Sequence, residues 1–293
     1  MLNIKICSLT VYQSLKIFAI GIVVTTLTAC SSLISSQTSK LADGLTNAVL
    51  NSEDLETVAQ GAPAYLLLID GLIESAPDDA SLLTTGAKLN GAYAAAFVDD
   101  DARSKAMNQK ALNYAKGAAC SQNASLCNVQ TIEFQVLEKA VLEATSIEPL
   151  YVLGVAWLGW LQAHSDDWNA IAQLSRAKLL LDRVVELDGA HDGGNAHLYL
   201  GGIATLLPPA MGGQPELGKQ HFETAIALSE GKNLLAKVIY AQQYARLVFD
   251  QDLHDRLLNE VLTSDPQVPG LTLSNLAAKQ QAQVLLDESA EYF

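Results

Sequence analysis

Residues 181–187 read LDRVVEL, residues 222–228 read FETAIAL, and residues 258–262 read LNEVL. In each segment the apolar residues recur three and four positions apart, which is the spacing that places them on one face of an α-helix. The segments begin 41 and 36 residues apart, and residues 195–207 and 234–248 supply further helical patterns between them. This repetition predicts a stack of helical hairpins, because a single helix pair cannot bury its own apolar face.

The same organisation extends toward the amino terminus. Helical patterns cover residues 65–75, 80–98 and 103–119, and turn-forming residues separate them. No segment shows the sustained alternation of apolar and polar residues that a half-buried strand requires. We therefore predict an all-α fold, a tetratricopeptide-like array of helical hairpins (an α-solenoid), in which residues 51–293 form a single domain.

The first 29 residues have the features of a secretory signal peptide. Lys5 and Lys16 provide positive charge, and residues 17–27 form an apolar stretch that is short for a membrane-spanning helix. The stretch ends in Leu27-Thr28-Ala29-Cys30, which resembles the lipobox of bacterial lipoproteins. The resemblance implies cleavage before Cys30 and a lipid on its sulfur. The alternative is a cysteine that follows a signal peptide by chance.

The residues after the cleavage site predict where the protein resides. Residues 30–50 are expected to form a lipidated, polar tether between the membrane and the helical domain. Ser31, where an aspartate is associated with retention at the inner membrane, favours the periplasmic side of the outer membrane of a Gram-negative bacterium. The lipid would be the anchor, since no later segment is apolar enough to span a membrane.

The composition excludes several classes of protein. The chain carries 18 Lys and Arg against 32 Asp and Glu, which gives a formal net charge of −14. Proteins that bind nucleic acids normally present a basic face, so we expect no nucleic-acid partner. With 49 % hydrophobic and 17 % charged residues, the chain has the composition of a folded rather than a disordered protein.

Two cysteines remain beyond the lipobox. Cys120 and Cys127 flank a short polar stretch between helical patterns, and the periplasm is an oxidising compartment. We predict a disulfide that closes this loop. The alternative, a redox-active pair, would be expected to show the Cys-x-x-Cys spacing, which this pair lacks.

No pattern indicates catalysis, a cofactor or a metal. The sequence contains neither a G-x-S-x-G nor a G-x-x-x-x-G-K motif. His191 and His197, with Asp188 and Asp192, do not have the spacing that places two imidazoles on one helical face, so we assign them to a turn and a helix start. The three aspartates at 99–101 are expected to end one helix and begin the next. We therefore predict a protein that is not an enzyme.

Six large side chains are candidates for lining a cleft that holds an apolar ligand or a partner. Most of them lie on helices that would be the first of each pair, and these helices line the concave face of tetratricopeptide arrays. The alternative is ordinary packing between helices. The candidates are Trp157, Trp160, Tyr199, Met211, Tyr240 and Tyr244.

The carboxy-terminal half contains motifs that resemble a known family. Residues 207–216 read LPPAMGGQPE, residues 221–226 read HFETAI, and residues 271–275 read LTLSN. These motifs are similar to those of the T components of tripartite ATP-independent periplasmic (TRAP) transporters, which are tetratricopeptide-like lipoproteins. The residues that carry the family pattern, with an expected structural role, are Pro208, Pro209, Gly212, Gly213, Phe222 and Asn275.

The resemblance implies an accessory role in transport. A T component would bind the periplasmic solute-binding protein of a TRAP transporter and help to transfer a solute, which could be apolar. The resemblance also leaves room for homo-oligomers. The alternative is a tetratricopeptide scaffold lipoprotein that holds peptide segments during assembly of the cell envelope.

Overall fold

The computed structural model describes residues 44–293, so the predicted signal peptide and the lipid-bearing Cys30 lie outside the described residues. Residues 50–293 form one compact unit, which contains the helices discussed below. The prediction of an all-α fold is confirmed for the described residues, which contain no strand. None of the described helices is both long and apolar enough to cross a membrane.

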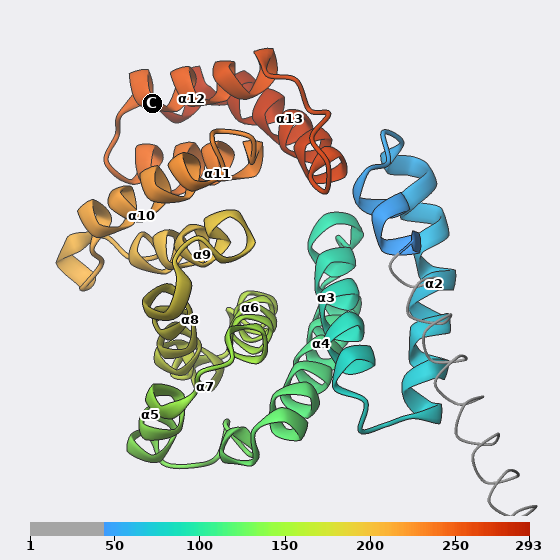
Figure 1. Ribbon diagram of the computed structural model, residues 1–293. Coiled ribbons are helices and arrows are strands. Elements are labelled where there is room, and N and C mark those ends of the chain that lie inside the picture. Colours follow the sequence, from blue (N-terminus) through green and yellow to red (C-terminus); the bar gives the residue numbers. More distant parts are fainter. Residues whose placement is uncertain (1–43) are drawn as a thin grey trace, which may run out of the picture. The chain divides into compact units, whose positions relative to one another are not determined.

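The helices follow one another with short connections (Figure 1). The amino-terminal helices are α2 (Leu55–Ser75), α3 (Ala80–Phe97), α4 (Asp101–Gln122), α5 (Phe134–Glu143), α6 (Ile147–Ala163), α7 (Trp168–Ile171) and α8 (Leu174–Asp188). The carboxy-terminal helices are α9 (Asn195–Ala204), α10 (Pro215–Leu228), α11 (Leu234–Ile239), α12 (Gln251–Thr263), α13 (Thr272–Asp287) and α14 (Ser289–Tyr292). A π-helix, η4 (Tyr240–Ala245), continues α11, and the short 3₁₀ turns are η1 (Ala124–Leu126), η2 (His191–Gly194) and η3 (Pro209–Met211).

Aspartates begin several of these helices. Asp100 accepts a hydrogen bond from the backbone N–H of Arg103 at 2.7 Å and so begins α4, as the triple-aspartate segment predicts. Asp54, Asp79 and Asp250 cap α2, α3 and α12 in the same way. Each carboxylate satisfies backbone donors that have no partner within the helix itself.

Several predicted helices differ in their bounds from the observed ones, and the helix expected to begin at residue 65 begins at Leu55. The helix expected over 195–207 ends at Ala204, whose carbonyl accepts a hydrogen bond from the backbone N–H of Gln214 at 2.8 Å. The hydroxyl of Thr205 also donates to the carbonyl of Gly201 at 2.9 Å. The helix expected over 234–248 changes to π-helical geometry midway. Local hydrogen bonds of this kind leave no mark on apolar periodicity.

The apolar faces of the helices form two clusters of buried side chains. The first core cluster extends from α3 to α9 and includes the fully buried Trp157 and Leu181. The second core cluster extends from α9 to α13 and includes the fully buried Phe222 and Leu258. Helix α9 contributes to both, because Leu200 belongs to the first cluster and Leu198 to the second. The leading apolar residues of the three segments quoted from the sequence are therefore buried, as predicted.

Cys120 and Cys127 form the predicted disulfide. Their Cα atoms lie 4.5 Å apart, and the bond holds η1 against the carboxy-terminal end of α4. Leu126 within the closed loop and Val129 just after it are fully buried in the first core cluster. The disulfide therefore fixes a connection that packs against this core.

Candidate functional site

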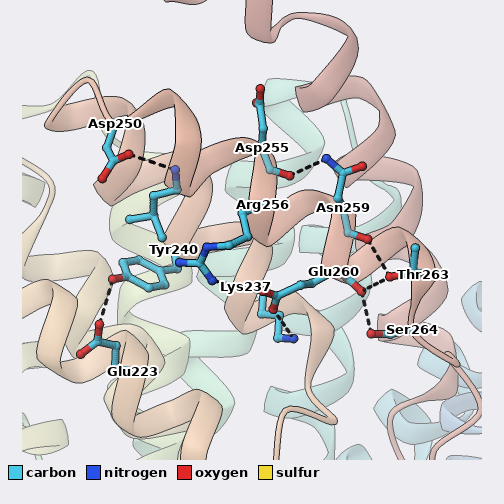
Figure 2. A network of polar contacts seen from close by, with 11 residues as sticks. Glu223, Lys237, Tyr240, Asp250, Asp255, Arg256, Asn259, Glu260, Thr263 and Ser264 are labelled. Carbon is cyan, nitrogen blue, oxygen red and sulfur yellow. Dashed lines mark hydrogen bonds and ion pairs between the residues drawn. The ribbon is translucent and has the colours of Figure 1, made fainter.

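A groove lies between α10, α11 and α12, and Figure 2 shows several of its polar side chains from close by. Its volume is about 640 Å³, and a second hollow of about 500 Å³ adjoins it and shares Glu223 and Ala227. We call the larger hollow the charged groove, because four carboxylates and three basic side chains line it together with apolar ones. The lining residues are Lys219, Glu223, Ile226, Ala227, Lys237, Tyr240, Asp250, Asp252, Leu253, Arg256, Leu257 and Glu260.

Glu260 organises one end of the charged groove. Its carboxylate accepts from Lys237 Nζ at 2.8 Å and from Arg256 at 3.1 Å, so two basic side chains share one acid. The hydrogen bond from Lys237 is the main reason that the pKa of Glu260 is lowered. The side chain of Arg256 remains 60 % exposed despite this contact.

Two tyrosine–glutamate pairs connect η4 to α10. The Tyr240 hydroxyl donates to Glu223 at 3.2 Å, and the Tyr244 hydroxyl donates to Glu216 at 3.0 Å. Burial, reinforced by these carboxylates, raises the pKa of Tyr244 to about 12 and that of Tyr240 still further, so both hydroxyls stay protonated donors. Neither Glu216 nor Glu223 has a basic partner among the described residues, so both carboxylates can receive a cationic group of a partner.

An apolar loop, residues 206–214, joins α9 to α10. Leu206, Leu207 and Met211 are exposed, Met211 to 66 %. Glycine is required at two positions: Gly212 has a φ of 92°, and a Cβ on Gly213 would lie 1.6 Å from the carbonyl oxygen of Leu207. The glycines therefore constrain the backbone of the loop. The large apolar side chains of the loop nevertheless remain exposed.

The sequence model of the TRAP transporter T-component family matches residues 51–293. The chain belongs to this family. The match includes every helix from α2 to α14, and both the charged groove and the apolar loop lie within it. No curated protein matches the chain at a significant level.

Membership identifies this T-component as an accessory transporter subunit. The family is not a known family of enzymes, and the match gives no support to the alternative of an envelope-assembly scaffold. Among residues 44–293, no group of three or more His, Cys, Asp or Glu side chains is placed to hold a metal ion.

The T-component does not bring its six candidate cleft residues together. Trp157 is fully buried in the first core cluster, and Trp160 and Tyr199 pack against the same cluster. Tyr240 and Tyr244 are buried in the second core cluster, while Met211 lies on the apolar loop. Of these residues, only Tyr240 lines the charged groove.

The polar edges of the buried aromatic rings have partners. Trp157 Nε1 donates to Gln173 at 3.3 Å. Trp160 Nε1 donates to Gln109 at 2.8 Å, and the Trp160 ring stacks on His164. These contacts tie the tryptophans into packing between helices in this part of the T-component.

The residues of the family pattern have identifiable structural surroundings. Phe222 is fully buried and stacks on Tyr240 with 5.3 Å between ring centroids. The side chain of Asn275 accepts from the backbone N–H of Leu234 at 3.0 Å and donates to the carbonyls of Lys232 and Pro266. Pro208, Pro209, Gly212 and Gly213 all lie in the apolar loop.

Several side chains of the site escaped the sequence analysis. Glu216 and Glu223 are seven residues apart on α10, and Tyr240 and Tyr244 are four apart, so each pair shares a helical face. That spacing was available in the sequence, but the match between the two faces depends on tertiary packing. Trp168, which is 84 % exposed at the start of α7, was also missed, because exposure cannot be read from a single tryptophan.

Proposed function

We propose that this chain is a non-enzymatic, lipid-anchored T-component that binds the periplasmic solute-binding subunit of a TRAP transporter and helps to transfer a solute. In this proposal the lipid on Cys30 holds the protein at the outer membrane, and the helix pairs repeat in the manner of a tetratricopeptide array. The observation that carries the binding function is the exposed apolar loop in an accessory transporter subunit.

The apolar loop has the physical character of a docking element. Exposed, contiguous apolar side chains are typical of surfaces that contact other proteins. Its prolines and constrained glycines fix the backbone before binding, so little conformational entropy is lost when a partner covers it. The three exposed anchors would be Leu206, Leu207 and Met211.

The charged groove supplies the polar part of the same surface. Helix α10 begins directly after the apolar loop and carries Glu216, Lys219 and Glu223. Apolar anchors surrounded by charged groups are the usual anatomy of a protein–protein interface. The six aromatic and methionine candidates from the sequence remain a prediction for solute contact.

The proposal can be tested by measuring the affinity of the full-length chain in detergent for the purified TRAP solute-binding subunit of the same organism. Replacing two anchors, Leu207→Ser with Met211→Ser, should weaken binding by about 10- to 100-fold, as loss of interface anchors does. The matched control is Leu67→Ser, since Leu67 is 72 % exposed on α2, and it should change the affinity less than twofold.

Two outcomes would contradict the proposal in different ways. If the unmodified chain fails to bind the solute-binding subunit both with and without solute, the accessory role assigned here is wrong. If the chain binds but the double variant binds equally well, the apolar loop is not the contact surface.

A further inference from the structure

Two histidines meet where α9 packs against α10. His197 Nδ1 and His221 Nδ1 lie 2.9 Å apart, and the ring centroids are separated by 5.1 Å. A neutral imidazole has one donor nitrogen and one acceptor nitrogen. The contact therefore requires a proton on one Nδ1 and a lone pair on the other, so the two facing nitrogens hold a single proton between them.

The pair lies at the junction of the two core clusters. His197 stands between Ala196, which is buried in the first cluster, and Leu198, which is buried in the second. His221 directly precedes Phe222, the fully buried aromatic residue of the second cluster. The contact thus joins the two helices that carry the apolar loop between them.

The surroundings provide little to balance a second positive charge. From α8, Lys178 and Asp182 act on His221 in opposite directions, and they are paired with each other at 2.7 Å. From η2, His191 interacts with Glu148, and Asp192 accepts from Tyr151.

Three further contacts to α9 and its carboxy-terminal end come from uncharged groups. The turn after α8 approaches His197 at Gly189. From α11, Asn233 donates to Asn195, and from η4, Gln243 accepts from Thr205.

We propose that His197 and His221 form a proton-responsive latch between α9 and α10. In the closed form the pair holds one shared proton at the facing nitrogens. Protonation of both rings places two N–H donors, each on a cation, face to face at a distance where neither can accept. The rings then separate, α10 loosens from α9, and the apolar loop loses its fixed conformation.

Burial lowers the pKa of both histidines, and for His221 the neighbouring His197 lowers it further. The folded form therefore resists the second proton. Unpacking frees both rings to titrate near 6.5, and each unit of pKa difference between the closed and open forms favours opening tenfold once both rings are charged. The latch is therefore closed at neutral pH, and acidification through the range in which free imidazoles titrate favours its opening.

Hydrogen exchange of the full-length chain in detergent tests the latch. After correction for the intrinsic pH dependence, backbone amides of α9 and α10 should exchange at least about tenfold faster at pH 5 than at pH 7.5, whereas those of α4 should not change. His221→Gln and His197→Gln remove the second charge, so either variant should lose most of this acceleration. The control is His164→Gln, because the ring of His164 stacks on Trp160 and does not belong to the pair. This variant should retain the faster exchange at pH 5.

Side-chain NMR of the unmodified protein gives a readout that does not depend on a variant folding. The proposal expects the two rings to titrate in separate steps, with the second protonation coinciding with the exchange change. Independent titration of both rings near pH 6.5, or pH-dependent exchange that persists in both glutamine variants, would overturn it. The latch stands apart from the proposed partner, since its test involves no binding measurement.

Discussion

The two ends of the helical region use their polar side chains differently. In the first core cluster, buried or half-buried polar groups satisfy the backbone of neighbouring connections: Arg176 donates to the carbonyls of Val129 and Ile132 at 2.9 and 2.7 Å, and Arg183 donates to that of Ala144 at 3.2 Å. Around the second core cluster, Asn275 and Lys279 also donate to backbone carbonyls, but Lys237 and Arg256 share the carboxylate of Glu260 beside the charged groove.

The difference indicates a division of labour. Side chains committed to backbone carbonyls fix how elements pack, because an unpaired buried carbonyl costs free energy. Charged groups paired beside solvent contribute little to stability but can exchange their partners for those of another protein. We therefore expect substitutions in the first region to change mainly the free energy of unfolding, and substitutions around the charged groove to change mainly binding.

The largest effect is expected at Trp157. Replacing this fully buried side chain with alanine leaves a cavity in the first core cluster and should lower the free energy of unfolding by about 3–5 kcal/mol. Urea unfolding at pH 7 measures the change. The control, Trp168→Ala, removes an 84 % exposed ring and should change stability by less than about 0.5 kcal/mol. A loss in Trp157→Ala no larger than that expected of the control would contradict a role of Trp157 in packing the first core cluster.

The disulfide provides a second, smaller test of the same region. The double variant Cys120→Ser with Cys127→Ser should lower the free energy of unfolding by about 2–3 kcal/mol, since the unfolded chain gains the freedom that the closed loop removed. Reduction of the unmodified protein should reproduce this loss, while affinity for the solute-binding subunit stays unchanged. Titration of two reactive thiols in the unfolded, unreduced protein would show that the bond does not form.

Apolar periodicity was sufficient to predict buried helical faces in both of these regions. The spacing around Leu181 and Phe222 identifies buried helical faces. It places the apolar side chains on one side of the helix, and packing that side against other helices removes it from water. The disulfide follows from compartment and spacing. Apolar spacing and cysteine spacing are local properties of the chain, so they can be recognised in the sequence without knowing which helices pack against each other.

The charged groove could not be predicted in the same way. Periodicity shows that Tyr240 and Tyr244 share a face, but not that this face meets Glu216 and Glu223 of the preceding helix. The π-helical turn that carries both tyrosines contains no proline or glycine from which it could have been predicted. A sequence also does not distinguish an aromatic residue that packs in a core from one that lines a cleft. Both interpretations of the six candidate residues, cleft lining and packing between helices, therefore stayed open.

Substitution of Glu260 is the smallest expected effect and the sharpest test of the comparison. The folded-state pKa of this carboxyl lies below the ordinary value of 4.5, so the ionised group stabilises the fold above that pH, and the contribution is lost as the pH falls through the folded pKa. Because Glu260 is 40 % exposed, Glu260→Gln should cost less than about 1 kcal/mol at pH 7, and the difference should shrink as the pH falls below 4.5.

The control for Glu260 is Glu230→Gln, which removes the acid of an exposed pair with Lys232 and should produce no measurable change. A cost that is equal at pH 3 and pH 7 would mean that Glu260 acts through packing rather than charge. If the groove serves binding, Glu260→Gln should also alter the affinity for the solute-binding subunit by more than it alters stability, because it leaves Lys237 and Arg256 without their shared acceptor on the surface. An unchanged affinity together with lost stability would make the groove part of the scaffold, and the contrast between the two regions would then fail.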